Sequence, residues 1–295
     1  MYKVIEHSFF GLFVGALIIS FSSVFVKISQ VNPMVSAFYR VLFGCLFLSL
    51  ACAVKKEFKK ASLKNSLLAV ACGLIFSIDL FCWHFSIEYV GPGLATILGN
   101  CQVFILALAG WLLFKEPLGA LFLLALPMAL AGLYLIIGVD MNQLSPQYFL
   151  GVGLGIVTAI SYGGFLLMIR HVQSDQKGLV FYYQVIVTGS CSVFLGIVVV
   201  GSGHSFVIPN MGSLASLLGL GGLSQALAWA MIGFCLPRVD ASRAGLALLL
   251  QPALSFVWDV VFFSRQTGGA GWIGVALVLA AIYMGMVYGR KKSSS

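Results

Sequence analysis

The chain has 295 residues, of which 60% are hydrophobic and 9% are charged, with a mean hydropathy of +1.04. A water-soluble domain carries about 25% charged residues, so this composition excludes a soluble enzyme. A helix that crosses a bilayer needs about 20 apolar residues, and the chain is long enough for about ten of them. The seven cysteines lie in apolar segments without metal-ligand spacing. We therefore expect no disulfide framework, no metal site and no cofactor.

Apolar segments separated by turn residues follow one another along the chain, and each predicts a membrane-spanning helix. They cover residues 8–27, 34–54, 65–88, 92–114, 121–138, 149–169, 178–200, 213–236, 241–263 and 270–289. The predicted turns lie at Asn32-Pro33, Gly91-Pro92, Glu116-Pro117, Ser145-Pro146, Pro209-Asn210 and Gly268-Gly269. The first segment lacks a convincing small-residue cleavage site, so we expect a retained helix rather than a signal peptide. The predicted fold class is an all-α integral membrane protein with ten transmembrane helices.

The distribution of basic residues predicts how the chain is oriented in the membrane. With the N-terminus inside, only Lys27, Arg40 and Arg265 of the 17 Lys and Arg residues lie toward the outer side. The positive-inside rule then places both termini in the cytoplasm and the chain in the cytoplasmic (inner) membrane. The basic clusters at residues 55–64 and 290–292 have the charge to bind nucleic acid or anionic lipid. Topology already explains them, so we expect contact with membrane lipid and no nucleic-acid partner.

An internal repeat divides the chain into a first half, residues 1–144, and a second half, residues 145–295. A shift of 149 residues aligns Val90 with Val239, Ala95 with Ala244, Gln102 with Gln251, Phe114 with Phe263 and Tyr134 with Tyr283. Small changes of register extend the match to two Gly-x-x-x-Gly motifs, at Gly11 and Gly151, which we interpret as helix contacts. Five helices in each half would make the two repeats inverted, an architecture of secondary transporters. Chance similarity between apolar segments is the alternative.

Motifs near the fourth helix of each half point to a family. They are the segments from Trp83 to Ala95 and from Leu112 to Glu116, and in the second half those from Arg238 to Ala244 and from Gln251 to Ala253. Together with the two predicted inverted repeats of five helices each, these motifs resemble the EamA-type branch of the drug/metabolite transporter superfamily. The resemblance extends over nearly the whole chain.

Each half departs once from the family pattern, in which a proline is followed thirteen residues later by an acidic residue. The first half has Val103 in place of the proline, and the second has Arg265 in place of the acid. The resemblance implies a carrier for a small metabolite in the cytoplasmic membrane, in a family whose members export amino acids or exchange or import other solutes.

An ionisable side chain inside a span usually faces a cavity or a partner, because placing it in lipid costs at least about 2.5 kcal/mol. Asp79 lies deep in the third segment, and Trp83 shares its helix face at i+4. Gln225 and Trp229 repeat this spacing 146 residues later. We predict that these four side chains line one substrate cavity between the halves. The alternative is a structural Asp79 bonded to a neighbouring helix.

Arg40 lies in the second segment, where its guanidinium could bind a substrate carboxylate or pair with Asp259 or Glu88. Tyr39, Tyr162 and Asn100 are weaker candidates for the lining of the site. His84 is about 140° around the helix from Asp79 at 100° per residue, so we expect a packing role for it.

These features favour a secondary transporter of an amino acid or amino-acid-like solute that works by alternating access, with possible proton coupling through Asp79. A carrier for a bulkier nucleoside-derived metabolite is the alternative among transporters, with Trp83 and Trp229 stacking on a base. An intramembrane enzyme is a rival from another class, but the sequence offers no set of catalytic residues on one helix face. A receptor or scaffold would predict larger loops. The sequence leaves open whether the protein is a monomer or a dimer.

Overall fold

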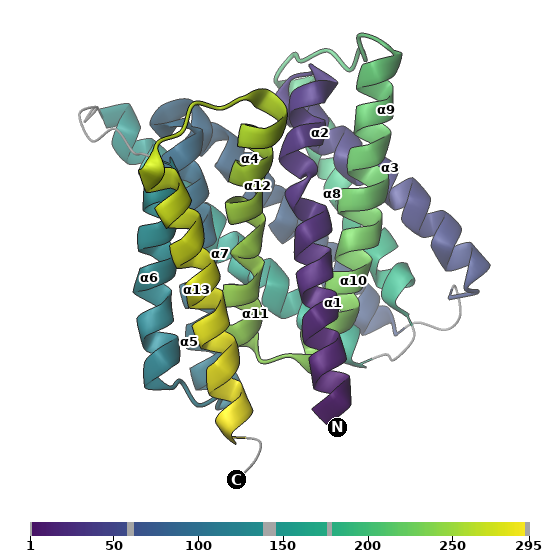
Figure 1. The fold of residues 1–295 in the computed structure, drawn as a ribbon. Coiled ribbons are helices and arrows are strands. Elements are labelled where there is room, and N and C mark those ends of the chain that lie inside the picture. Colours follow the sequence, from purple (N-terminus) through teal and green to yellow (C-terminus); the bar gives the residue numbers. More distant parts are fainter. Residues whose placement is uncertain (1, 58–61, 138–145, 176–178, 293–295) are drawn as a thin grey trace.

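The computed structural model describes residues 2–57, 62–137, 146–175 and 179–292. Over these ranges the chain forms helices joined by short connections, without a β-strand. The helices assemble into a bundle, and the start of α1 and the end of α13 lie at the same end of it (Figure 1). The predicted all-α fold class is confirmed.

The elements of the first half are all α-helices. Their bounds are α1 Tyr2–Ser20, α2 Ser22–Ser29, α3 Pro33–Val54, α4 Leu63–Asn100, α5 Gln102–Phe114 and α6 Ala120–Ile137.

The second half adds a π-helix, η1, and a short 3₁₀-helix, η2, to its α-helices. The bounds are α7 Pro146–Asp175, α8 Val180–Gly201, α9 Met211–Gly219, η1 Leu220–Leu227, α10 Ala228–Cys235, η2 Leu236–Arg238, α11 Ala241–Leu248, α12 Leu250–Phe263 and α13 Gly269–Lys292.

Length and hydropathy identify the helical stretches that can cross a membrane. Eight of those in the described ranges meet both criteria, and two shorter apolar helices, Ala120–Ile136 and Gly269–Gly285, accompany them. Each of the ten predicted segments overlaps one of these stretches. Large apolar side chains such as Leu113 and Val200, which are 70% and 68% exposed, point out of the bundle, as lipid-facing side chains do. The chain is therefore a multi-pass membrane protein.

Most predicted turns coincide with a helix boundary, and two of them have a clear chemical reason. The side chain of Asn32 accepts a hydrogen bond from Met34 N at the start of α3, and that of Asn210 accepts one from Ser213 N at the start of α9. The turn predicted at Gly91-Pro92 is wrong, because α4 is helical through these residues. In a membrane, glycine and proline are tolerated within helices because neighbouring groups satisfy the backbone that they free.

Glycines bring helices of the two halves into close contact. A Cβ atom added to Gly11 of α1 would lie 2.6 Å from Cys235 Sγ of α10, and one added to Gly151 of α7 would lie 2.6 Å from Tyr89 Cβ of α4. The contact between α6 and α13 is equally tight, with an added Cβ on Gly132 only 2.7 Å from the backbone oxygen of Gly274. The Gly-x-x-x-Gly motifs therefore lie at helix contacts, as predicted.

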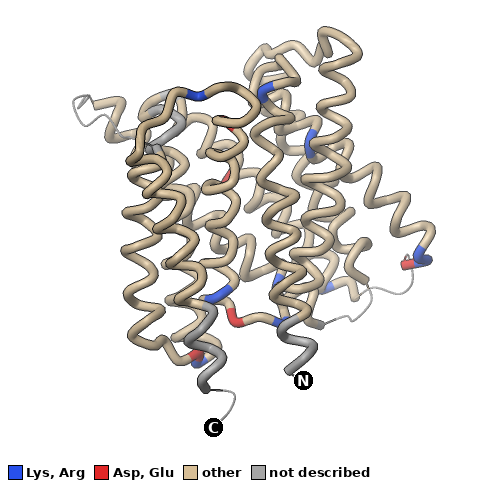
Figure 2. Tube along the Cα trace, viewed as in Figure 1, with Lys and Arg blue, Asp and Glu red and all other residues tan. Residues whose placement is uncertain are grey.

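Charged residues lie mainly at the ends of the bundle, and the end that holds the start of α1 and the end of α13 carries many of the basic ones (Figure 2). The orientation itself remains a prediction from the sequence. Ser205 lies in the exposed connection between α8 and α9, which we expect on the outer side, whereas position 59, outside the described residues, is expected inside.

This orientation predicts which single cysteines a thiol reagent can reach from outside the cell, in a variant from which the native cysteines have been removed. Ser205→Cys is expected to react with an impermeant maleimide added to intact cells, and Lys59→Cys only after permeabilisation, because charged reagents do not cross the bilayer. Labelling of intact cells at position 59 but not at 205 would mean that the orientation is inverted.

Candidate functional site

The predicted site residue Arg40 links the two halves of the chain. It lies on α3, about 10 Å along the helix from Pro33 at 1.5 Å per residue. Its Nε donates a hydrogen bond of 2.8 Å to Oε1 of Gln225 in the second half. A guanidinium inside a membrane span is stable only where polar groups compensate its lost hydration. Gln225 provides part of that compensation and also fixes the orientation of the planar guanidinium group of Arg40.

The local structure around Gln225 allows this contact. Gln225 belongs to the π-helix η1, whose hydrogen bonds span five residues instead of four, and such helices are frequent at functional sites. The backbones of η1 and α3 come very close at two glycines. A Cβ on Gly44 would lie 2.4 Å from Cγ of Gln225, and a Cβ on Gly221 would lie 2.5 Å from Cβ of Phe43. Only glycine at these two positions allows the observed approach.

We therefore expect Gly44→Ala to displace Gln225 and weaken its bond to Arg40. Overpacking of this kind costs about 1–3 kcal/mol of stability, which thermal unfolding of the purified protein would measure. Gly189→Ala on α8 is the matched control, because its Cβ would meet Cys45 Sγ at an ordinary 3.6 Å. Equal stability of both variants would show that η1 can move away without loss.

Asp79 is the buried carboxylate nearest to this link. It lies on α4 and is 7% exposed, and it is close enough to Arg40 for their charges to attract. None of the ion pairs between described side chains joins the two groups, however. A positive and a negative group thus lie near each other inside the membrane spans without direct contact.

An aromatic cluster lies next to these polar groups. The indole of Trp229 on α10 is 1% exposed, and its ring centroid lies 5.0 Å from Phe165, 5.8 Å from Phe76 and 6.4 Å from Tyr162. Tyr162 on α7 interacts electrostatically with both Asp79 and Arg40, and its hydroxyl lies beside the side-chain amide of Gln251. The structure therefore brings Arg40, Asp79, Gln225, Trp229 and Tyr162 into one region.

Three other predicted residues have contacts elsewhere. The ring of Trp83 lies edge-on to His84, with centroids 5.0 Å apart, and no described ring contact joins it to Trp229. Tyr39 donates a hydrogen bond of 2.6 Å to the backbone oxygen of Phe206, in the connection after α8. Asn100 donates one of 2.8 Å to the oxygen of Thr96 in its own helix. A role for these three side chains in substrate binding remains a prediction.

His84 has a hydrogen-bond partner in its own helix, since Nδ1 lies 2.6 Å from the backbone oxygen of Leu80, and its packing role stays a prediction. The ion pair considered between Arg40 and Asp259 is absent, because Asp259 has other partners. Its carboxylate lies 3.4 Å from Lys27 Nζ and 3.7 Å from Arg265 Nη1. The side chain of Glu88, the other partner considered, lies outside the described residues.

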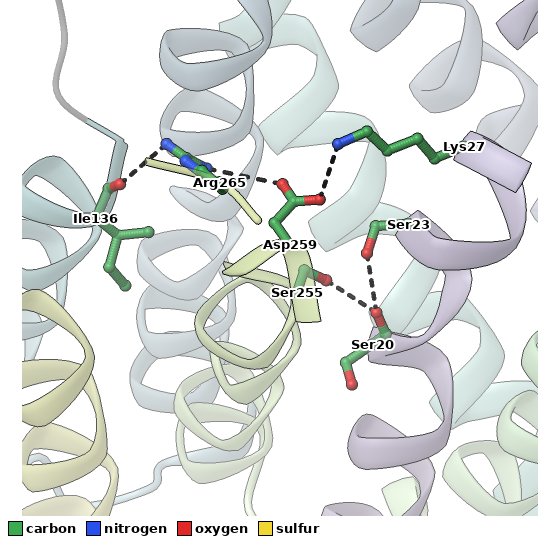
Figure 3. A network of polar contacts seen from close by, with 7 residues as sticks. All are labelled: Ser20, Ser23, Lys27, Ile136, Ser255, Asp259 and Arg265. Carbon is green, nitrogen blue, oxygen red and sulfur yellow. Dashed lines mark hydrogen bonds and ion pairs between the residues drawn. The ribbon is translucent and has the colours of Figure 1, made fainter. Parts of the chain in front are cut away.

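Figure 3 shows Asp259 between its two cations, close to a smaller hydrogen-bond network of serines. Ser255 and Ser23 both donate to the backbone oxygen of Ser20, at 3.0 and 3.2 Å. Arg265 also donates to the backbone oxygen of Ile136 near the end of α6, at 3.3 Å. This network connects α2 of the first half with α12 of the second.

Sequence reasoning missed a second link between the halves, at Glu116. Its carboxylate accepts hydrogen bonds from Ala241 N at 2.7 Å, Ser242 N at 3.1 Å and Ser242 Oγ at 2.8 Å. These groups begin α11, so Glu116 caps a helix of the other half, where a negative charge is favourable. Arg170 Nη1 lies 3.6 Å away. The sequence had singled out Glu116 as a family acid, but nothing in it indicated the target.

Comparison with known proteins supports both the fold and the family. Among the solved structures that match, one titled only as the crystal structure of a protein has a TM-score of 0.81 over 97% of this chain and 98% of its own. Its sequence identity is 17%, so the likeness shows the fold alone. No curated protein matches the chain. The model of the EamA-like transporter family matches residues 8–138. The resemblance seen in the sequence is confirmed over these residues: positions 8–138 of this multi-pass membrane protein are similar to the EamA-like transporter family.

Proposed function

We propose that the protein is a secondary active transporter of a small metabolite, namely an amino acid or amino-acid-like solute, and that it works by alternating access across the cytoplasmic membrane. One observation carries the proposal. The buried Asp79 and the half-buried Arg40 lie near each other where the halves meet, with opposite charges and without a direct ion pair.

This arrangement matches the chemistry of a zwitterion. A guanidinium binds a carboxylate through two parallel hydrogen bonds, and the bond to Gln225 uses only Nε of Arg40. A carboxylate such as Asp79 binds an ammonium group. A substrate that carries both groups on one carbon would satisfy both charges, whereas a substrate with one of them would leave a charge unpaired, which is costly in a low-dielectric site.

Alternating access is supported by features shared between the halves. Helices α5 and α12 are each followed by a residue in the left-handed backbone conformation. These residues are Lys115, with a φ of 54°, and Ser264, with a φ of 50°. Next in the chain, Glu116 N donates to Gly110 O at 2.8 Å and Arg265 N donates to Asp259 O at 3.3 Å. All three pairs of positions are 149 residues apart, as in the sequence repeat. Two related halves with a site between them fit the inverted-repeat mechanism, in which one half moves against the other.

The energy source follows from the motifs. The sequence has no Gly-x-x-x-x-Gly-Lys-Ser/Thr loop that would bind ATP, so transport would draw on a gradient. Asp79 is a buried group that could carry a coupling proton. Of the other functions considered, carriage of a nucleoside-derived metabolite needs an accessible Trp229, whose ring is enclosed by Phe76, Phe165 and Tyr162.

A binding experiment tests the proposal directly. Purified protein in detergent is heated with an amino acid, with the amine that lacks its carboxylate and with the acid that lacks its ammonium group. Stabilisation by the amino acid alone is expected, because only the zwitterion pairs both charges. Uptake of that amino acid into proteoliposomes should then follow an imposed gradient. Stabilisation by nucleosides without any by amino acids would overturn the proposal.

A further inference from the structure

The π-helix η1 interrupts a membrane span that is otherwise wound as an α-helix. It occupies Leu220–Leu227 between α9 and α10, in the most buried of the eight described spans. At its end, the backbone N–H of Ala228 donates to the oxygen of Leu223, five residues earlier. π-Helices are rare in proteins and usually short. A segment with this winding therefore needs specific contacts that stabilise it.

The contacts that favour the π-helical form join η1 to α3 of the first half. Oε1 of Gln225 accepts the hydrogen bond of 2.8 Å from Arg40. The backbones approach so closely at Gly221 and Gly44 that the side chain of Gln225 has little room to turn. A change of winding in η1 would move Gln225 relative to α3 and break its bond to Arg40.

Ser224 in the same segment favours the other form. Its Oγ is a buried atom without a hydrogen-bond partner, and the residue is 0% exposed. In an α-helix a serine hydroxyl can donate to the backbone oxygen four residues earlier, as Ser77 of α4 does to Gly73 at 2.8 Å. With α-helical winding, Ser224 could donate to Leu220 in this way. One side chain of η1 is thus satisfied in the π-helical form and another in the α-helical form.

The helices on both sides of η1 are held by hydrogen bonds to other helices. Ser216 Oγ of α9 donates to the backbone oxygen of Phe25 in α2 at 2.6 Å, and Gln184 Nε2 of α8 donates to that of Trp229 in α10 at 3.0 Å. A change of winding between two held ends has to be accommodated within η1 and the first turn of α10. It would therefore move the side chains of Gln225 and Trp229 together.

We propose that η1 is a conformational switch between π-helical and α-helical winding. In the π-helical form Gln225 orients Arg40 for the substrate's carboxylate. In the α-helical form Ser224 gains its hydrogen bond and Gln225 releases Arg40, which weakens the hold on the substrate. The part of the switch in transport rests on the proposed function, whereas the presence of two forms requires no substrate and can be tested without one.

The test uses fluorine NMR of purified protein that contains fluorotryptophan in place of tryptophan. Trp229 follows η1 directly and packs against Phe165 with ring centroids 5.0 Å apart, so its signal should report the winding. Its absence from Trp229→Phe identifies that signal. The wild type is expected to show two Trp229 environments in exchange, whose ratio gives the proportion of the two forms.

Two variants should shift this ratio in opposite directions. Gln225→Met removes the bond to Arg40 and should raise the proportion of the α-helical to the π-helical form about tenfold, the value of about one good hydrogen bond. Ser224→Ala removes the hydroxyl that only the α-helical form satisfies and should lower the ratio by a similar factor. Ser29→Ala is the matched control, because Ser29 is also 0% exposed but donates to the backbone oxygen of Val26 at 2.7 Å. It should leave the ratio unchanged.

A single Trp229 environment in the wild type and in both variants would overturn the switch. Shifts of the ratio in the same direction in Gln225→Met and Ser224→Ala would also overturn it, since loosened packing would explain them. In proteoliposomes Ser224→Ala should carry substrate more slowly, because it holds η1 in one form, and a wild-type rate would remove the switch from transport. Two forms in a protein that moves no amino acid would contradict the proposed function and leave the switch itself intact.

Discussion

Asp79→Asn is expected to fold like the wild type and to lose proton-driven accumulation of substrate. The amide has the shape of the carboxyl group but cannot carry and release a proton. No ion pair is broken by the change, since none of those between described side chains involves Asp79, and Arg40 keeps its bond to Gln225. The measurement is uptake into proteoliposomes under an imposed pH gradient, with thermal unfolding as the test of folding.

Exchange at equilibrium separates coupling from structure in this variant. If Asp79 carries the coupling proton, exchange of labelled for unlabelled substrate should be affected less than accumulation. If it only stabilises a neighbouring helix, exchange and thermal stability should fall together. Asp240→Asn is the matched control, because Asp240 is an accessible carboxylate paired with Arg243 at 3.1 Å. Wild-type accumulation with unchanged pH dependence in Asp79→Asn would exclude Asp79 from the mechanism.

Glu116→Ala is expected to destabilise the protein by about 3–5 kcal/mol, as the loss of one partner of a buried ion pair usually does. The change leaves the first N–H groups of α11 without an acceptor and Arg170, which is 16% exposed, without its anion. The measurement is the unfolding free energy in mixed detergent micelles. Glu116→Gln should lose less, because its side-chain oxygen can still accept one of the hydrogen bonds.

Asp259→Asn provides the comparison, because Asp259 also interacts with two groups but is more accessible. Its side chain is 28% exposed, and its partners Lys27 and Arg265 are 53% and 37% exposed. Ion pairs of this kind contribute about 1 kcal/mol or less, and salt screens them. A loss at Asp259 as large as that at Glu116 would contradict this distinction between a buried and an exposed link.

Much of the fold and part of the site could be predicted from the sequence. Spans, turns and fold class follow from composition, because every helix in lipid must be long and apolar. Asp79 and Arg40 stand out because charges within spans are costly. The match of Asp79 and Trp83 with Gln225 and Trp229 drew attention to Gln225, which accepts a hydrogen bond of 2.8 Å from Arg40, whereas the shared cavity lining stays a prediction.

What could not be predicted depends on how helices pack against one another. A helix that is apolar on all sides carries little periodic information about which face is buried. Trp111 and Trp229 look alike in sequence, yet one is 55% and the other 1% exposed. The cap that Glu116 forms on α11 and the pairing of Asp259 with Lys27 each join residues more than 120 positions apart in different halves. The π-helix η1 likewise has no recognised local signature.

The contacts of Glu116 and Arg265 have a consequence for the repeat that the sequence predicts. These positions are equivalent in the predicted repeat. Glu116 binds the N-terminal end of α11, which prefers an anion, whereas Arg265 binds the oxygen of Ile136 in the last turn of α6, which prefers a cation. A protein made of two copies of the first half would place a glutamate against the end of α6. Two copies of the second half would place an arginine against the start of α11. With the repeat as the sequence predicts it, we therefore expect that neither half could be replaced by a copy of the other.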